Sequence, residues 1–417
     1  MKLTTKIMLG LVLGATAGAG AAAAGGFAHD AVLWIQPAGT AFIRLISMVV
    51  VPLVVASLFV GTCSVGDIRR LGRIGGRSLA FFLITTVIAA SLGLSLALLF
   101  RPGLALDATT RDRIAADYSA GAAGRIEAAE TISIGERILE IIPRNPIEAA
   151  ADTNLLPLIF ATLLFAAAAS VLKPAQRDPL LAFFGGVNAA AGVVIGWVMK
   201  LAPYAVFILI AGALARFGID LLRGLLLYAV LVIVGELVHG LGILMLILRI
   251  AGISITRFWK HVADAPLLGF STASSNAALP VSLDVAENRL GVSREVASFV
   301  LPVGATLNMN GSALYKGITV VFLAQVYGIP LGPSQYVTII LMSTLAAVAG
   351  VGVPGSSLVT TVMVLTAVGM GPQAAAGIAL VVGLDRFLDM FRTANNVLGD
   401  LTCAAVVAKL DGETLNA

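Results

Sequence analysis

The sequence predicts an all-α polytopic membrane protein with eight transmembrane helices and two re-entrant helical hairpins. Of its 417 residues, 59% are hydrophobic and 12% are charged, which is about half the charged share of a soluble domain. Apolar runs long enough to cross about 30 Å of hydrocarbon recur along the chain. In the second half, three runs are interrupted by polar breaks that contain glycine or proline. Membranes tolerate such breaks only where protein or a cavity surrounds them.

The same composition excludes a soluble globular enzyme, a disordered chain and a disulfide-stapled secreted domain. The net charge of +4 is typical of basic cytoplasmic loops in a membrane protein, and no nucleic-acid partner is expected. Cys63 and Cys403 lie inside apolar runs and provide neither a disulfide framework nor a metal site. The sequence contains no nucleophile–base pair, hydrolase elbow or HExxH motif, so it does not predict an enzyme.

The first half of the chain predicts six crossing helices. Their apolar runs are approximately 7–27, 43–66, 79–100, 153–172, 187–214 and 224–249. Lysine and arginine cluster in every other connection, at 69–77, 173–177 and 249–261, and the positive-inside rule places these connections in the cytoplasm. The long connection 101–144 mixes acids and bases and is expected to be an extracytoplasmic loop.

The N-terminus has some features of a cleavable signal peptide, since Lys2 and Lys6 precede an alanine-rich apolar run. The run from Ile7 to Phe27 is longer than the apolar core of a typical signal peptide, and many crossing segments follow. A retained first helix is therefore expected, with both termini of the chain in the cytoplasm.

The second half predicts two hairpins and two further crossing helices. Short apolar arms flank the break FSTASSNAALP within 263–290 and the break GVGVPGSS within 335–370. The run 297–325 is broken by TLNMNGS, whereas 374–409 is continuous. The first hairpin has charged flanks and the second has none, so they are expected to enter from opposite faces. Paired interrupted segments of this kind indicate a transporter binding site between inverted repeats.

The last crossing run carries a polar stripe. Its five ionisable residues would cost on the order of 12–17 kcal/mol if they faced lipid near the bilayer centre. Five polar positions fall within roughly 80° of one another on a helical wheel: Asp385, Asp389, Arg392, Asn396 and Asp400. This stripe must face the protein interior or a water-filled cavity. An internal salt-bridge network that only holds helices together is the alternative.

The chemistry of the stripe suits a zwitterionic solute and a hard cation. Arg392 offers a planar donor for a carboxylate, and Asp389 at i−3 offers an acceptor for an ammonium group, as an acidic amino acid requires. Asp400 and Asn396 supply oxygen ligands for Na⁺, which Gly304 and Asn308 of the interrupted run could complete. The three histidines, His29, His239 and His261, are scattered and are interpreted as loop or interfacial residues.

Four motifs in fixed order resemble the dicarboxylate/amino acid:cation symporters, the glutamate transporter family. They are ASSNAALP, GATLNMNGSALY, GVPGSS and GLDRFLDMFRTANNVLGD, and NPIEAAADTNLLPLIF resembles the fourth-helix region of that family. The resemblance covers essentially the whole chain. It implies a homotrimer in the lipid bilayer whose protomers transport independently by an elevator mechanism.

The resemblance also implies a division into domains. Residues 1–72 and 145–216 would form the scaffold and trimerisation elements. Residues 73–100 and 217–417 would form the mobile transport domain.

The family pattern implies two sets of binding residues. The substrate set comprises Ser274, Ser275, Ser312, Val353, Asp389, Arg392, Thr393 and Asn396. The set for two sodium ions comprises Gly304, Thr306, Asn308, Met309, Ala347, Val348, Gly350, Asn396 and Asp400. Within the first set, Arg392 and Ser312 would bind the substrate side-chain carboxylate and Asp389 its amino group.

Several residues depart from the family pattern. Asn310 replaces an aspartate, and Phe82 replaces a tyrosine beside Thr85 and Thr86, so a third cation site loses a charge and a hydroxyl and is expected to be weak or absent.

Two further departures flank the substrate site. Ala273 stands where some archaeal relatives have a hairpin arginine, and Arg386 is expected to supply the compensating charge. Phe391 stands where some relatives have glycine, and is expected to alter the packing of the pocket.

The leading interpretation is a Na⁺-coupled symporter that imports glutamate or aspartate across a prokaryotic inner membrane without an organic cofactor. A proton-coupled glutamate symporter or a C4-dicarboxylate symporter of the same family remains open. Asp389 favours an amino acid, because a substrate without an ammonium group would leave that carboxylate buried and unpaired. An ion channel is the alternative from a different class, and the mixed charges of the stripe disfavour it.

Overall fold

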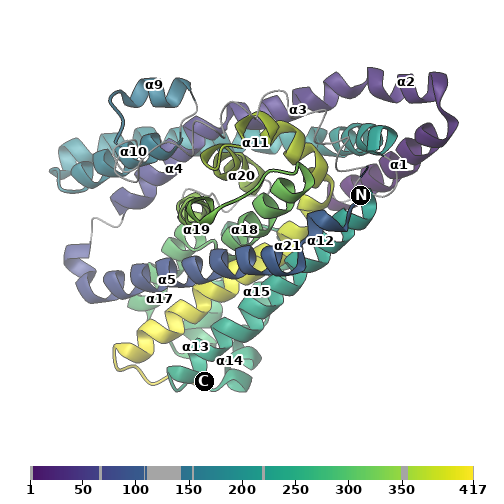
Figure 1. Ribbon diagram of the computed structural model, residues 1–417. Coiled ribbons are helices and arrows are strands. Elements are labelled where there is room, and N and C mark those ends of the chain that lie inside the picture. The colour runs from purple at the N-terminus through teal and green to yellow at the C-terminus, as the bar shows by residue number, and fades with distance from the viewer. Residues whose placement is uncertain are drawn as a thin grey trace.

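The computed structural model describes residues 3–64, 68–107, 109, 142–152, 155–217, 221–348 and 356–416. Every regular element in these ranges is a helix (Figure 1). The prediction of an all-α fold is confirmed. Within the same ranges, four stretches are long and apolar enough to cross a membrane: Thr5–Ala24, Ile74–Ala105, Pro174–Val198 and Leu221–Ile250.

The N-terminal helices follow the predicted runs except at one break. They are α1 (Leu3–Ala24), α2 (Gly26–Trp34), α3 (Gln36–Met48), α4 (Val50–Ser64) and α5 (Ile68–Phe100). The prediction of one helix over 43–66 is wrong, because α3 ends at Met48 and α4 begins at Val50. Pro52 has no N–H group to donate to the Met48 carbonyl oxygen, and its position in the first turn of α4 is one that proline tolerates.

The middle of the chain holds longer helices. They are α9 (Pro146–Ala151), α10 (Leu155–Ser170), α11 (Pro174–Phe217), α12 (Leu221–Leu237), the π-helical η3 (Val238–Leu244) and α13 (Met245–Ile250). The predicted run 187–214 begins too late, because α11 starts at Pro174, where the missing N–H of proline costs nothing.

Part of the predicted extracytoplasmic loop 101–144 packs into the protein. The short helix η2 (Pro102–Ala105) contacts α12 and α18, and Gly103 N donates to Gln325 Oε1 at 2.9 Å. Residues 108 and 110–141 of this connection lie outside the described part of the chain.

The C-terminal half contains the interrupted elements. They are α14 (Ile255–Val262), α15 (Asp264–Thr272), α16 (Ser275–Asp284), η4 (Val285–Leu290), α17 (Arg294–Leu307), α18 (Asn310–Val326), α19 (Pro333–Val348), α20 (Ser356–Ala367) and α21 (Gly371–Leu410). The predicted breaks separate α15 from α16 and α17 from α18. The arms α15 and α16 pack against each other, as do α19 and α20, so both predicted hairpins have paired arms.

The long helix α21 organises this half. It runs diagonally through the molecule in yellow (Figure 1) and contacts the hairpin arms α15, α16 and α20 as well as α12, α17 and α18. Its polar stripe is buried throughout. The prediction that these side chains face the protein interior is confirmed.

Candidate functional site

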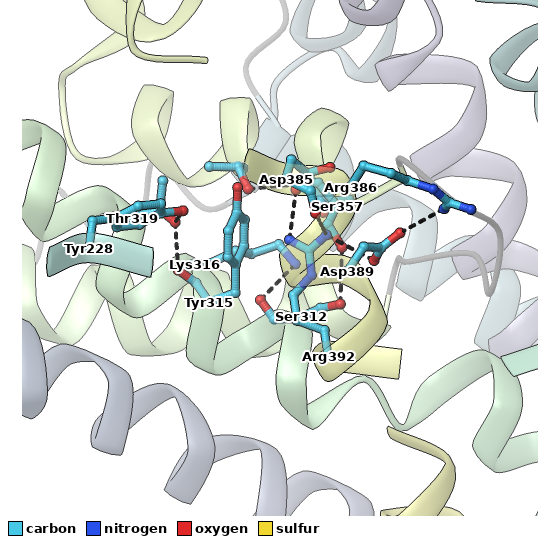
Figure 2. A network of polar contacts seen from close by, with 12 residues as sticks. Tyr228, Ser312, Tyr315, Lys316, Thr319, Ser357, Asp385, Arg386, Asp389 and Arg392 are labelled. Atoms are coloured by element: carbon cyan, nitrogen blue, oxygen red, sulfur yellow. Dashed lines mark hydrogen bonds and ion pairs between the residues drawn. The ribbon is translucent and has the colours of Figure 1, made fainter. Parts of the chain in front are cut away.

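The site is centred on Arg392, which α21 places in the interior. The side chain is fully buried. Its Nη1 atom lies 2.8 Å from Asp385 Oδ1, and its Nη2 atom donates to Asp389 Oδ1 at 2.8 Å (Figure 2). The guanidinium carbon lies 4.0 Å from the ring centroid of Tyr315 on α18, a distance at which a cation is attracted to the ring face.

The ion pairs of Arg392 join residues of α21 to one another and not to another helix, and they do not use every donor of Arg392. The Nε–H group has no hydrogen-bond acceptor among the described residues. A guanidinium with five N–H groups can bind a further carboxylate while it keeps an existing partner. The pairing within α21 is therefore compatible with a ligand site.

Arg386 extends the network to the first hairpin. Its Nη1 atom lies 3.5 Å from Asp389 Oδ2, and its Nη2 atom donates to the Thr272 carbonyl oxygen at 3.5 Å. Thr272 ends α15 directly before Ala273, whose φ of +49° turns the chain into the break. Arg386 thus brings a positive charge to the tip of the hairpin, next to the position that lacks an arginine.

The other side chains on this flank lie where α15 and α16 meet α21. Ser274 caps α16 and accepts a hydrogen bond from Ala277 N at 3.3 Å. Ser275 is buried in the first turn of α16, and Thr393 is buried on α21. A Cβ atom placed on Gly269 of α15 would lie 3.5 Å from Thr393 Cγ2, so Thr393 faces the hairpin.

The aromatic residue Phe391 also packs on this hairpin. Its ring centroid lies 5.0 Å from that of Phe270 on α15 and 5.4 Å from that of Phe387. These contacts place Phe391 between α21 and the first hairpin, and its effect on the packing of the pocket stays a prediction.

The second hairpin approaches the site from α20. Ser312 Oγ on α18 and Ser357 Oγ on α20 lie 3.0 Å apart and share a hydrogen bond (Figure 2). The Ser312 carbonyl oxygen accepts a hydrogen bond from the fully buried Lys316 at 3.2 Å. Val353 lies outside the described residues.

The predicted cation ligands converge where the break between α17 and α18 meets α21. Asn308 Nδ2 donates to Asp400 Oδ1 at 2.8 Å and to the Asn396 carbonyl oxygen at 3.5 Å. A Cβ atom on Gly304 would lie 2.5 Å from Asp400 Oδ1, so only glycine leaves room for this carboxylate.

These groups fit a hard cation. Asn308 Oδ1 is buried and has no hydrogen-bond partner among the described residues. Rotation of this amide would exchange its nitrogen for the oxygen, and the two orientations differ only in their hydrogen bonds. The oxygen would then join Asp400 in a set of oxygen ligands of the kind that Na⁺ requires.

The remaining predicted sodium ligands are only partly gathered. Met309 and Ala347 share a small buried apolar cluster, and Val348 follows Ala347 as the last residue of α19. Thr306 is exposed, and its hydroxyl donates to the Val303 carbonyl oxygen within α17 at 2.9 Å. Gly350 lies outside the described residues.

The residues of the predicted third cation site lie together and are neutral. Thr86 Oγ1 lies 2.7 Å from Asn310 Oδ1, and Asn310 Nδ2 donates to Thr85 Oγ1 at 3.3 Å. Phe82 is buried and accepts from Thr86 through its carbonyl oxygen at 2.6 Å. The polar atoms of this cluster satisfy one another, and no carboxylate is among them.

Three buried ionisable residues are not among the predicted site residues. Glu236 on α12 and Lys316 on α18 are buried in the interior, and the interpretation of His239 as a loop or interfacial residue is wrong. His239 lies in η3, fully buried, with its Nδ1 atom 3.2 Å from Asn395 Oδ1. All three occur inside apolar runs, and an ionisable residue in such a run is by default a candidate for function.

Comparison with known proteins agrees with this geometry. The model of the sodium:dicarboxylate symporter family matches residues 3–410. The chain is similar to the proton/sodium-glutamate symport protein of Bacillus subtilis, with 36% identity over 98% of this chain and 93% of the relative. It is similar to the proton/glutamate-aspartate symporter of Escherichia coli, with 35% identity over 90% and 85% of the two chains. It is also similar to the C4-dicarboxylate transport protein of Anaeromyxobacter sp., with 30% identity over 98% and 89%.

Proposed function

The chain belongs to the sodium:dicarboxylate symporter family, whose members are transporters and not enzymes, and from this premise we propose that it imports glutamate or aspartate together with Na⁺. The observation that carries the proposal is the buried Arg392 guanidinium, held by Asp385 and Asp389 on a helix against which arms of both hairpins pack. A cation and a carboxylate one turn apart match the charges of an acidic amino acid. The ion-channel alternative has no support from relatives that are named for symport and transport.

In this proposal, each charged part of the substrate has a partner. Arg392 binds the side-chain carboxylate through its free Nε–H group, with Ser312 assisting. Asp389 accepts the ammonium group. Thr393 and Asn396 position the backbone end, and the N-terminus of α16 at Ser275 receives the α-carboxylate as helix N-termini do.

A C4-dicarboxylate is the second candidate substrate, and Arg386 is the observation that favours it. Its Nη1 atom lies 3.5 Å from Asp389 Oδ2, so Asp389 retains a cationic partner when the substrate has no ammonium group. Both kinds of relative are similar to this chain.

Sodium is the proposed coupling ion, bound by Gly304, Asn308, Asn396 and Asp400. A second ion would use carbonyl oxygens of both interrupted segments: Thr306, Met309, Ala347, Val348 and Gly350. No organic cofactor is proposed.

The proposed architecture has eight crossing helices and two re-entrant hairpins, in an inner-membrane homotrimer with cytoplasmic termini. Residues 1–72 and 145–216 form the scaffold. Residues 73–100 and 217–417 move as the transport domain of an elevator. The packing of both hairpins on α21 supports a transport domain that carries the site as one unit.

Uptake by the full chain in liposomes tests the function. Labelled aspartate is expected to accumulate under an inward Na⁺ gradient and to be displaced by unlabelled glutamate. Uptake that ignores Na⁺ and follows only a pH gradient would overturn sodium coupling. Accumulation of succinate in preference to aspartate would favour a C4-dicarboxylate as the transported substrate.

The neutral residues of the predicted third cation site can be tested by restoring the missing carboxylate and hydroxyl. The double substitution Asn310→Asp and Phe82→Tyr is expected to steepen the Na⁺ dependence of uptake and lower the half-saturating Na⁺ concentration several-fold, because a carboxylate and a hydroxyl create a further cation site. The measurement is aspartate uptake against Na⁺ concentration. Phe82→Tyr alone is the control, since it adds the hydroxyl without the charge. An active double variant with the wild-type Na⁺ curve would contradict our account of this cluster.

A further inference from the structure

A second buried acid, Glu236, lies outside the polar stripe of α21. Its side chain is 3% exposed. One oxygen, Oε2, accepts a hydrogen bond from Asn395 Nδ2 at 2.5 Å. The other oxygen, Oε1, is buried and has no hydrogen-bond partner among the described residues. An ionised carboxylate with an unsatisfied oxygen is costly in such a place, whereas a protonated carboxyl group is neutral.

The elements packed around Glu236 bring few charges to it. From α21, the backbone of Arg392 lies across Gly311 from Glu236, because a Cβ atom on Gly311 would lie 2.7 Å from the Arg392 carbonyl oxygen and 2.8 Å from Glu236 Oε2. The Arg392 guanidinium is paired with Asp385 and Asp389. From α18, the ionisable side chains are Tyr315 and Lys316, and the Lys316 amine is bound to the Ser312 carbonyl oxygen.

The other neighbours of α12 are η3, η2 and α5. From η3, His239 reaches the opposite atom of the Asn395 amide. The residues of η2 are not ionisable, and α5 places Leu96 next to Gly235. On α12 itself, Arg223 and Tyr228 are the other ionisable residues. Within the described chain, no basic nitrogen forms an ion pair with the Glu236 carboxylate.

The position of Glu236 links it to both proposed sites. It borders Gly311, whose backbone N donates to Asn396 Oδ1 at 2.9 Å. Its hydrogen-bond partner Asn395 is the neighbour of Asn396 on α21. A change in the charge of Glu236 would therefore act on the same turn of α18 and the same turn of α21 that carry the ligand groups.

A proton fits this place better than a metal ion. A cation such as Na⁺ needs several converging oxygen atoms, but the nearest polar partner of Glu236 is the N–H₂ group of an amide. A single carboxyl group needs no further ligand to hold a proton on Oε1.

We propose that Glu236 is a proton-binding site of the transport cycle, with Asn395 as its positioning residue. The carboxyl group is protonated in the conformation described here and releases its proton to water in the part of the cycle in which water reaches Oε1. The proton moves on and off one oxygen, and no other bond changes. This inference rests on the proposed symport function and adds H⁺ as a second coupling ion.

The test uses the full chain in liposomes that contain a pH-sensitive dye, under an inward Na⁺ gradient. Addition of aspartate is expected to acidify the lumen with the wild type. The variant Glu236→Gln is expected to take up labelled aspartate with Na⁺ but without proton movement. Its aspartate affinity should vary less than twofold between pH 6 and 8, against up to about tenfold per pH unit in the wild type where Glu236 titrates. The exposed acid Glu295 provides the matched control Glu295→Gln, which should move protons as the wild type does.

Two further measurements test the proton site at Glu236 if Glu236→Gln folds poorly. Glu236→Asp retains a carboxyl group and should retain proton movement. The infrared spectrum of the wild type should contain a protonated-carboxyl band that shifts in Glu236→Asp. Proton movement at the wild-type ratio in Glu236→Gln would overturn the proposal, as would sodium-driven aspartate uptake by the wild type without any proton flux. Absence of uptake by the folded wild type would instead refute the proposed symport function.

Discussion

Replacement of Arg392 by alanine is expected to abolish binding of acidic substrates. The guanidinium is fully buried and is the cationic centre of the site. Loss of one partner of a buried, hydrogen-bonded charge pair costs roughly 3 kcal/mol, which corresponds to about 100-fold or more in affinity. Titration calorimetry of the purified protein with aspartate at saturating Na⁺ measures this loss. Arg392→Lys keeps the charge without the planar fork and should bind with an intermediate affinity.

A double variant separates a binding role of Arg392 from a purely structural one. Arg392→Gln combined with Asp385→Asn replaces the 2.8 Å ion pair by two neutral groups. If the network only held helices together, the neutral pair should restore folding and transport together. We expect folding to recover, as judged by thermal unfolding, while aspartate binding stays absent. Wild-type aspartate affinity in Arg392→Ala or in the double variant would refute the assigned role.

Replacement of Asp400 by asparagine is expected to uncouple transport from sodium. Asp400 is the one carboxylate among the proposed ligands of the first cation, and it lies 2.8 Å from the Asn308 amide. The affinity of an oxygen site for a hard cation depends on the number of charged ligands, so the half-saturating Na⁺ concentration should rise about tenfold or more. Aspartate binding measured over a range of Na⁺ concentrations checks this result.

A control for this variant lies at the end of the same helix. Asp411→Asn removes an acid that follows α21 and pairs with Arg77 at 3.2 Å. It should leave the Na⁺ dependence unchanged. If Asp400→Asn gave the same Na⁺ curve as Asp411→Asn, sodium would bind elsewhere.

Polar breaks at membrane depth are easier to predict from sequence than breaks inside apolar runs. The breaks between α15 and α16 and between α17 and α18 were located to within a few residues, because glycine, proline and polar residues at membrane depth leave few alternatives to a break. The predicted break at GVGVPGSS lies almost wholly outside the described residues. The break between α3 and α4 was missed because 43–66 is apolar on both sides of it and only the missing N–H of Pro52 indicates it.

The sequence also did not predict the burial of His239 and Glu236 or their shared partner. Each is a single ionisable residue in an apolar run, so neither forms a stripe that a helical wheel would reveal. Their partner in the structure, Asn395, is 156 residues from His239 and 159 from Glu236. The membrane cost of each residue could have indicated a function, but no periodicity could have identified the partner.

By itself, the sequence determined the membrane environment, the helical class, the breaks and the inward direction of the α21 stripe. These follow from composition and from the helical repeat, which fixes the face on which each side chain of one helix lies. Only the tertiary structure decided which groups meet across helices, such as Asn308 with Asp400 and Thr86 with Asn310. The cost of burying a polar group in a membrane requires that it have a partner, but the helical repeat does not specify which residue of another helix provides it.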